Sequence, residues 1–143
     1  MMKKIALFVF LIALTGCSVK YTPKMVQHIK GSVFKATDRG YYTAELVMKP
    51  DPPLVGKNSA HLIIHDYEAD DITGLNITVI PFMPEKGIQS NEKPVVKDAG
   101  RGLYIIENIY FRIPGMWELR LKISGPYMVD TVVLPLPEII EKP

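Results

Sequence analysis

The 143-residue chain has a single cysteine, Cys17, and no apolar run long enough to cross a membrane as a helix. One cysteine cannot form an intramolecular disulfide, so the fold must be held by its core. The uncharged stretch from Ile5 to Leu14 has about ten residues, the length of a signal-peptide core. A transmembrane helix needs roughly 20. These scarcities exclude a disulfide scaffold and a helical membrane-spanning protein.

Catalytic motifs and concentrated positive charge are also missing. The sequence contains no Gly-x-Ser-x-Gly, no His-Glu-x-x-His and no P-loop. Of its 17 basic residues, Lys3 and Lys4 precede the apolar run, and without them 15 basic residues balance 15 acidic ones. Nucleic-acid binding requires a clustered basic surface. We therefore expect a protein that is not an enzyme and has no nucleic-acid partner.

The first 17 residues have the features of an export signal. Lys3 and Lys4 form a positive start, the apolar run follows, and Thr15-Gly16 supply small residues at a cleavage position. Leu14-Thr15-Gly16-Cys17 resembles a bacterial lipobox, in which the cysteine is acylated and becomes the mature N-terminus. An ordinary signal peptide with a chance cysteine is the alternative. We expect residues 1–16 to be removed and Cys17 to carry the lipid.

Acylation of Cys17 implies membrane attachment outside the cytoplasm. Each buried CH₂ of an acyl chain adds about 0.8 kcal/mol of membrane affinity, so several chains on one residue anchor firmly. Ser18 follows the cysteine, where the enterobacterial sorting pattern that this resembles keeps aspartate for inner-membrane retention. The expectation is a lipoprotein on the periplasmic face of the outer membrane, if the cell has one.

Polar and proline-rich segments flank the central part of the mature chain. Residues 17–40 carry scattered apolar residues and suggest a tether with a short strand at 32–36. Pro135, Pro137 and Pro143 interrupt the end, so we expect a tail over 137–143. One folded domain is expected over residues 41–136.

Within that domain the hydrophobic period is two. Trp117, Leu119, Leu121 and Ile123 alternate with polar residues, which predicts a strand with one buried face. Similar runs occur at 41–48, 60–66, 75–80 and 127–134, separated by Gly- and Pro-containing turns. No stretch has a sustained helical period. The pattern predicts an all-β, antiparallel, immunoglobulin-like β-sandwich of about seven strands, with a small closed barrel as the rival. Trp117 is expected to be the largest contributor to its core.

Several short motifs occur in an order typical of one family. They are Gly56-Lys57-Asn58, Asp66 at a strand end, Gly74, Met83-Pro84, Gly102-Leu103-Tyr104 and Pro114-Gly115-Met116-Trp117-Glu118-Leu119. This order resembles the YtkA-like domain, an extracytoplasmic immunoglobulin-like sandwich related to FixH-type proteins. The resemblance covers about residues 41–136. It implies a possible role in metal handling, because several relatives are encoded beside genes for copper transport or oxidase assembly.

The residues to inspect for a copper role are methionine and histidine, which Cu(I) prefers as ligands. Met83 ends one expected strand, Met116 opens another, and His65 lies near the end of a third. If loops at one end of the sandwich converge, these three side chains could bind Cu(I). The alternative is that Met83 packs while Met116 and His65 are solvated. Many family members carry a histidine shortly after Met-Pro, which this chain lacks.

A second hypothesis is that the domain binds another envelope protein. Ile63, Ile80 and Phe82 are apolar residues on the strand faces opposite the expected core. Such residues can form a docking patch, or they can be covered by a second layer or by the N-terminal segment. We favour a non-catalytic, lipid-anchored module that binds an envelope protein, and keep the Cu(I) accessory role as the alternative.

Overall fold

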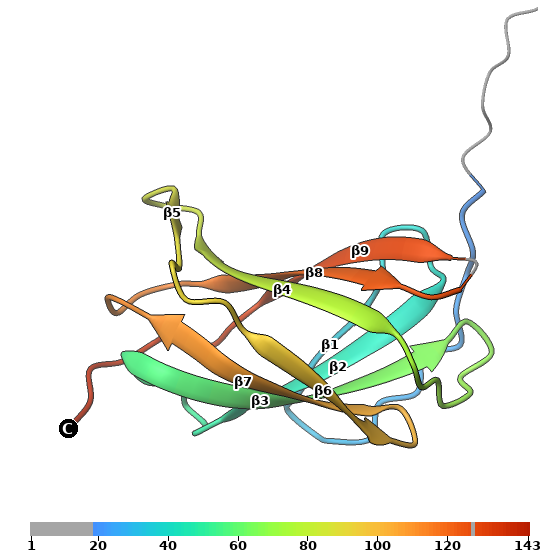
Figure 1. Cartoon of the computed structure of the whole chain (residues 1–143), viewed down its shortest axis with the longest axis horizontal. Coiled ribbons are helices and arrows are strands. Elements are labelled where there is room, and N and C mark those ends of the chain that lie inside the picture. The colour runs from blue at the N-terminus through green and yellow to red at the C-terminus, as the bar shows by residue number, and fades with distance from the viewer. Residues whose placement is uncertain (1–18, 127) are drawn as a thin grey trace, which may run out of the picture.

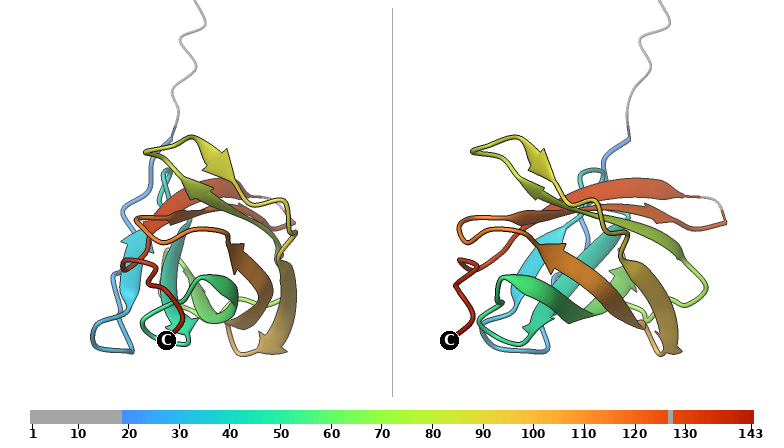
Figure 2. Two further views of the ribbon diagram at one scale, coloured as in Figure 1. Left: turned by 90° about the vertical axis from the view of Figure 1, so that its left-hand side faces the viewer. Right: turned by 60° about the vertical axis from the view of Figure 1, so that its left-hand side comes forward.

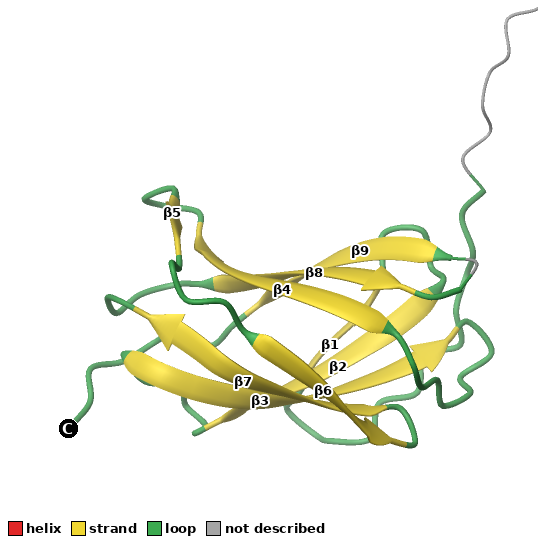
Figure 3. Ribbon diagram, in the orientation of Figure 1, coloured by secondary structure: helices red, strands yellow, loops and turns green. Residues whose placement is uncertain are grey.

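The computed structural model describes residues 19–126 and 128–143, so the expected signal peptide and Cys17 lie outside the described residues. The described residues form nine strands in two antiparallel sheets (Figures 1 and 3). In chain order the strands are β1 (Val33–Ala36), β2 (Tyr42–Lys49), β3 (Gly56–Asp66), β4 (Asn76–Met83), β5 (Ile88–Gln89), β6 (Val95–Gly100), β7 (Leu103–Phe111), β8 (Glu118–Ser124) and β9 (Val129–Pro135). The expected antiparallel β-sandwich is confirmed, with nine strands rather than about seven.

One sheet has the order β1-β2-β3-β7-β6 and the other β5-β4-β8-β9. The two sheets lie face to face, as the end-on views in Figure 2 show. Alternate side chains of each strand therefore point into a shared core or outward. In the four-stranded sheet, β8 pairs with β4 along one side, but on the other side β5 pairs only with Phe82 and Met83. Most of that side of β4 therefore has no neighbouring strand.

The core follows the period of two in the sequence. Trp117, Leu119, Leu121 and Ile123 are all buried, while Arg120 and Lys122 between them point outward. Trp117 packs against Phe111 with ring centroids 5.3 Å apart, and its indole N–H donates to the carbonyl of Ile113. Trp117 is also the largest buried side chain of the described residues, as the sequence predicts.

Both segments that we expected to flank the domain are instead packed on it. Residues 33–36 form β1, which confirms the short strand expected at 32–36, and residues 21–32 run over the outer face of the five-stranded sheet. At the other end, Ile139 is buried and pairs with Gly115, while Ile140 bridges to Leu54. The folded unit therefore extends beyond 41–136 in both directions. Composition did not reveal this, because both segments are mostly polar or proline-rich and are held largely through backbone hydrogen bonds.

The residues that the structure describes include no helix long and apolar enough to cross a bilayer.

Candidate functional site

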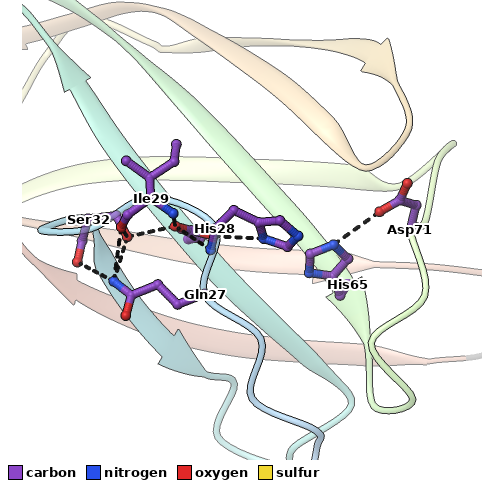
Figure 4. Close-up of polar contacts among 7 residues, drawn as sticks. Gln27, His28, Ile29, Ser32, His65 and Asp71 are labelled. Carbon is purple, nitrogen blue, oxygen red and sulfur yellow. Dashed lines mark hydrogen bonds and ion pairs between the residues drawn. The ribbon is translucent and has the colours of Figure 1, made fainter.

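Residues 21–32, which we call the strap, are fixed to the outer face of the five-stranded sheet by the side chain of Glu45 on β2. Glu45 lies opposite Ile63 of β3 and points away from the core. Its carboxylate accepts hydrogen bonds from the backbone N–H groups of His28 (2.9 Å) and Ile29 (2.6 Å) and from the hydroxyl of Ser32 (2.8 Å). Figure 4 shows these contacts around one turn of the strap. The carboxylate thereby organises the strap.

Glu45 is buried although it lies on an outer face, with 1% of its surface exposed. Burial alone would raise the pKa of this carboxyl, because it disfavours the charged form. The hydrogen bonds from His28, Ser32 and Ile29 outweigh that effect, so the pKa of Glu45 is lowered overall. The ionised carboxylate is therefore the form that holds the strap.

Two histidines extend this polar array. The ring of His28 stacks on that of His65, with centroids 4.8 Å apart and planes inclined by 33°. His28 Nδ1 lies 3.2 Å from Glu45, and His65 Nε2 lies 3.0 Å from Asp71. A carboxylate can only accept, so each of these ring nitrogens carries the proton. The array connects the strap, β2, β3 and the turn after β3 (Figure 4).

The N-terminal end of the strap is fixed at the end of the sandwich where β3 ends. The N–H of Tyr21 donates to the carbonyl of Arg39, and that of Lys24 donates to the carbonyl of Tyr67. The Tyr21 ring lies 4.9 Å from that of Tyr41 and 5.4 Å from that of Tyr67. This aromatic cluster and the Glu45 site fix the strap at both of its ends.

The structure does not bring the three proposed copper ligands together. Met83 is buried, and its Sδ-bound methyl lies so near Gly115 that a Cβ there would be 2.9 Å away. Met116 is 56% exposed at the same end of the sandwich. The first residue of β3, Gly56, pairs with Phe111, which packs against Trp117 beside Met116. His65 lies near the other end of β3, nine residues and about 30 Å of strand away from Gly56.

A shared coordination sphere for Met83, Met116 and His65 is therefore not formed. The third histidine, His28, lies in the strap, where its ring bonds to Glu45 while 46% of its side chain stays exposed. Among the described residues, no group of three or more His, Cys, Asp or Glu side chains is placed to hold a metal ion.

The proposed docking patch is divided between the two sheets. Ile63 lies on the outer face of the five-stranded sheet, beside the covered Glu45. Ile80 and Phe82 lie on the outer face of the four-stranded sheet. The guanidinium of Arg120 lies 3.7 Å from the centre of the Phe82 ring and covers it. These three residues therefore do not form one surface. The sequence could not show this, because strand alternation reveals which face a side chain occupies but not which sheet contains the strand.

The edges of the two sheets meet along two sides of the sandwich, which we call seams. Hydrogen bonds link the two sheets at one seam, which we call the closed seam. At the closed seam, between β1 and β9, Asp38 N–H donates to the carbonyl of Thr131 and Lys35 Nζ to that of Val133. Asp130, at the start of β9, is buried and accepts from the Thr37 hydroxyl (2.6 Å). It also accepts from the backbone N–H groups at 39 and 41.

At the open seam, between β4 and β6, no ladder of backbone hydrogen bonds joins the two strands. A cleft lies along β4 there, lined by residues 76–81 and by residues 89–94 of the segment that precedes β6. β6 is exposed along most of its length, with only Val96 and Gly100 half-buried. Figure 2 shows the two strands on the same side of the molecule.

Sequence reasoning missed Glu45, Asp130 and the residues of the strap. Glu45 occupies an outward position of a β-rich run, which is typical of a solvated residue. Its partners lie 13 to 17 residues earlier in the chain, and those of Asp130 lie 89 to 93 residues earlier. The only available signal was a charged residue in the middle of a mostly apolar strand.

Comparison with known proteins agrees with this fold. A crystal structure of a DUF4426 family protein from Pseudomonas aeruginosa superposes with a TM-score of 0.53 at 8% sequence identity, covering 76% of this chain and 100% of the other. At that identity the likeness concerns the fold alone. No curated protein matches the sequence. A model of the YtkA-like family matches residues 38–122, from the turn before β2 to within β8. That match spans more than half of the chain, so the protein belongs to the YtkA-like family.

Proposed function

We propose that this protein is a non-catalytic module that is anchored by a lipid on Cys17 outside the cytoplasm and binds another protein of the cell envelope. The sequence supports the anchor through Lys3, Lys4, the apolar run and Leu14-Thr15-Gly16-Cys17. The observation that carries the proposal is the strap. Its first bonded residue, Tyr21, is only four positions after Cys17.

A short link restricts how far the domain can stand from an anchor at Cys17. Four residues span at most about 14 Å when fully extended. A flexible tether of the length that composition suggested, residues 17–40, would allow several times that distance. The strap thus supports a module held close to the membrane surface, where it would meet other proteins of that membrane.

The polar side chains best suited to acid–base catalysis are engaged in the strap contact or directly beside it. Glu45 and His28 bond to each other within the strap contact, and His65 bonds to Asp71. Side chains engaged in this way orient structure and leave no free acid–base pair in the array. A binding role fits them better than a catalytic one. The separation of His65 from Met83 and Met116 argues against the three-residue ligand set of the Cu(I) alternative.

The anchor is tested by expressing the full chain and measuring the mass and membrane association of the mature protein. We expect cleavage before Cys17, an added mass of acyl groups, and release from membranes only by detergent. Cys17→Ser should yield an unlipidated protein that fractionates without the membrane. Ser18→Asp is the matched control, which should keep the lipid and move from the outer to the inner membrane. Recovery of wild-type protein free of acyl groups would contradict the proposal.

A further inference from the structure

β4 lacks a partner along most of one edge. It pairs with β8 over residues 76–82, but on its other side β5 pairs only with Phe82 and Met83. The stretch Asn76–Ile80 therefore has one bare edge, about 17 Å long at the usual rise of a strand. Unpaired backbone N–H and C=O groups at a strand edge are a template for another strand.

The direction of the Pro81 carbonyl shows which groups face that edge. It accepts a hydrogen bond from the N–H of Ser90, on the side away from β8. In a strand, N–H and C=O of one residue point to the same side and alternate from residue to residue. Ile77 and Val79 therefore direct both groups into the cleft. Pro81 fits this assignment, because proline at an edge-facing position costs no ladder bond.

The cleft is closed at both ends. At one end, Asp98 accepts hydrogen bonds from the N–H groups of Gly74 (2.6 Å) and Gly100 (2.8 Å) and links the two sides of the seam. At the other end, the Ser90 to Pro81 hydrogen bond and the short β5 pairing close it. Residues 89–94 form its far wall. Any added strand is therefore limited to the stretch between these two closures.

We propose that the bare edge of β4 binds an extended segment of another polypeptide, which adds as a strand between β4 and the segment 89–94. The donor and acceptor groups of Ile77 and Val79 complement in partial charge the N–H and C=O groups of an extended backbone. The segment has about five residues. Its inward side chains are apolar at alternate positions, since they lie beside Ile77 and Val79, which face the core.

This inference rests on the proposed function only for the identity of the partner as an envelope protein. A second copy of this chain is the competing occupant. Direct pairing of two β4 edges would bring the wall at residues 89–94 of each copy against the other, so a single segment fits better. The two occupants give different products in the test below.

Amide exchange on the full-length lipidated protein in detergent, read by NMR, tests whether the edge is free. We expect the Ile77 and Val79 amides to exchange within about tenfold of their intrinsic rates. The Thr78 amide, which faces β8, should be protected at least 100-fold. Strong protection of all three amides would overturn the inference without any variant.

Occupancy is tested by a photo-crosslinking residue at Asn91 on the cleft wall, in membranes of cells that make the protein. Lys35, exposed at the closed seam, is the matched control position. Val79→Pro removes the edge N–H, and Val79→Ala matches its loss of side chain while keeping that N–H. We expect the residue at position 91 to form an adduct that maps to one segment of another protein with apolar side chains at alternate positions. The residue at position 35 should form no such adduct. The adduct should be lost in Val79→Pro and should persist in Val79→Ala.

Each other outcome overturns the inference. These outcomes are no adduct from Asn91, an adduct that survives Val79→Pro, or an adduct with a second copy. Adducts with an envelope protein from Lys35 alone would overturn it and leave the proposed function standing. If neither position gives an adduct and the protein is found without its lipid, the proposed function fails as well.

Discussion

The two seams of this sandwich solve the same problem in opposite ways. Any sandwich of two open sheets has strand edges whose backbone groups need partners. Between β1 and β9 those groups are bonded by Lys35 and Asp38, and the buried Asp130 ties the turn after β1 to β9. Between β4 and β6 only the ends of the gap are bonded, by Asp98 and Ser90.

The difference indicates that an open edge is not forced by the fold. The closed seam shows that one lysine, one backbone N–H and one buried aspartate can link two strand edges in this chain. The same solution is absent from the middle of the other seam, where β6 is largely exposed. We infer that the closed seam serves stability and the open one serves binding, and the following variants separate these roles.

The largest effect is expected at the closed seam, from Asp130→Ala. This change leaves the N–H groups of Arg39 and Tyr41 without their acceptor and removes the shorter of the two bonds open to the Thr37 hydroxyl, which retains the Tyr42 carbonyl. Bonds to a buried charged group are worth roughly 1.5–3 kcal/mol, so we expect the free energy of unfolding to fall by about 3 kcal/mol. Urea denaturation measures it. Asp98→Ala at the open seam is the matched variant, and a loss as large as that of Asp130→Ala would contradict the comparison.

A smaller and local effect is expected from Glu45→Ala. Three strap donors lose their acceptor, so the strap should detach before the sandwich unfolds. A cost of about 2 kcal/mol corresponds to roughly 30-fold more detached strap. Limited proteolysis measures this as faster cleavage within residues 21–32. Glu107→Ala, which removes an exposed carboxylate paired with Lys97, serves as control and should leave cleavage unchanged.

Acid should weaken the strap without mutation. The pKa of Glu45 is lowered in the folded protein despite its burial, by hydrogen bonds from His28, Ser32 and Ile29. Its stabilising contribution is therefore complete above the pKa of the unfolded carboxyl, about 4.3, and is lost as the pH falls through the lower folded value. Protection of the Ile29 amide, corrected for intrinsic exchange, should fall over that range. The same fall in Glu45→Gln would show that another group is responsible.

The smallest effect is expected from Lys35→Met. Lys35 donates to the Val133 carbonyl from an exposed side chain, and such contacts contribute less than about 1 kcal/mol. Urea denaturation should therefore detect a change within about 0.5 kcal/mol of zero. Exchange at the closed seam should remain slow because the Asp38 to Thr131 bond persists. A large loss would mean that the closed seam depends on one lysine and is less robust than we infer.

Strand alternation in the sequence predicted the sandwich and much of its core. Trp117, Leu119, Leu121 and Ile123 are buried as their spacing indicates. The same alternation places Met83 inward with Ile77 and Val79, as the structure does. Proposing Met83 as a ligand gave its position beside a loop more weight than its place among the inward-facing alternate residues of the strand. Alternation was therefore a better guide to the location of this side chain than its residue type.

The candidate site was not predictable in the same way. Period-two patterning assigns a side chain to one of two faces, but it does not say what covers that face. Ile63 and Phe82 both occupy outward positions in the sequence pattern, but they lie on different sheets. Glu45 is covered by a polar segment that contributes two backbone N–H groups, and no side-chain pattern marks those donors. The open seam depends on the pairing order of β4 and β6, which alternation leaves undefined.

The strap has a consequence for how a partner would be encountered. Its bonds at Tyr21 and at Ile29 hold the chain on the sandwich from a point only four residues after Cys17. With a lipid at Cys17, that link would keep the bare stretch of β4, which begins two residues after Gly74, on a domain that stays near the bilayer. A partner in the same membrane would then search in two dimensions. The resulting effective concentration would let a five-residue contact, weak in solution, become well occupied.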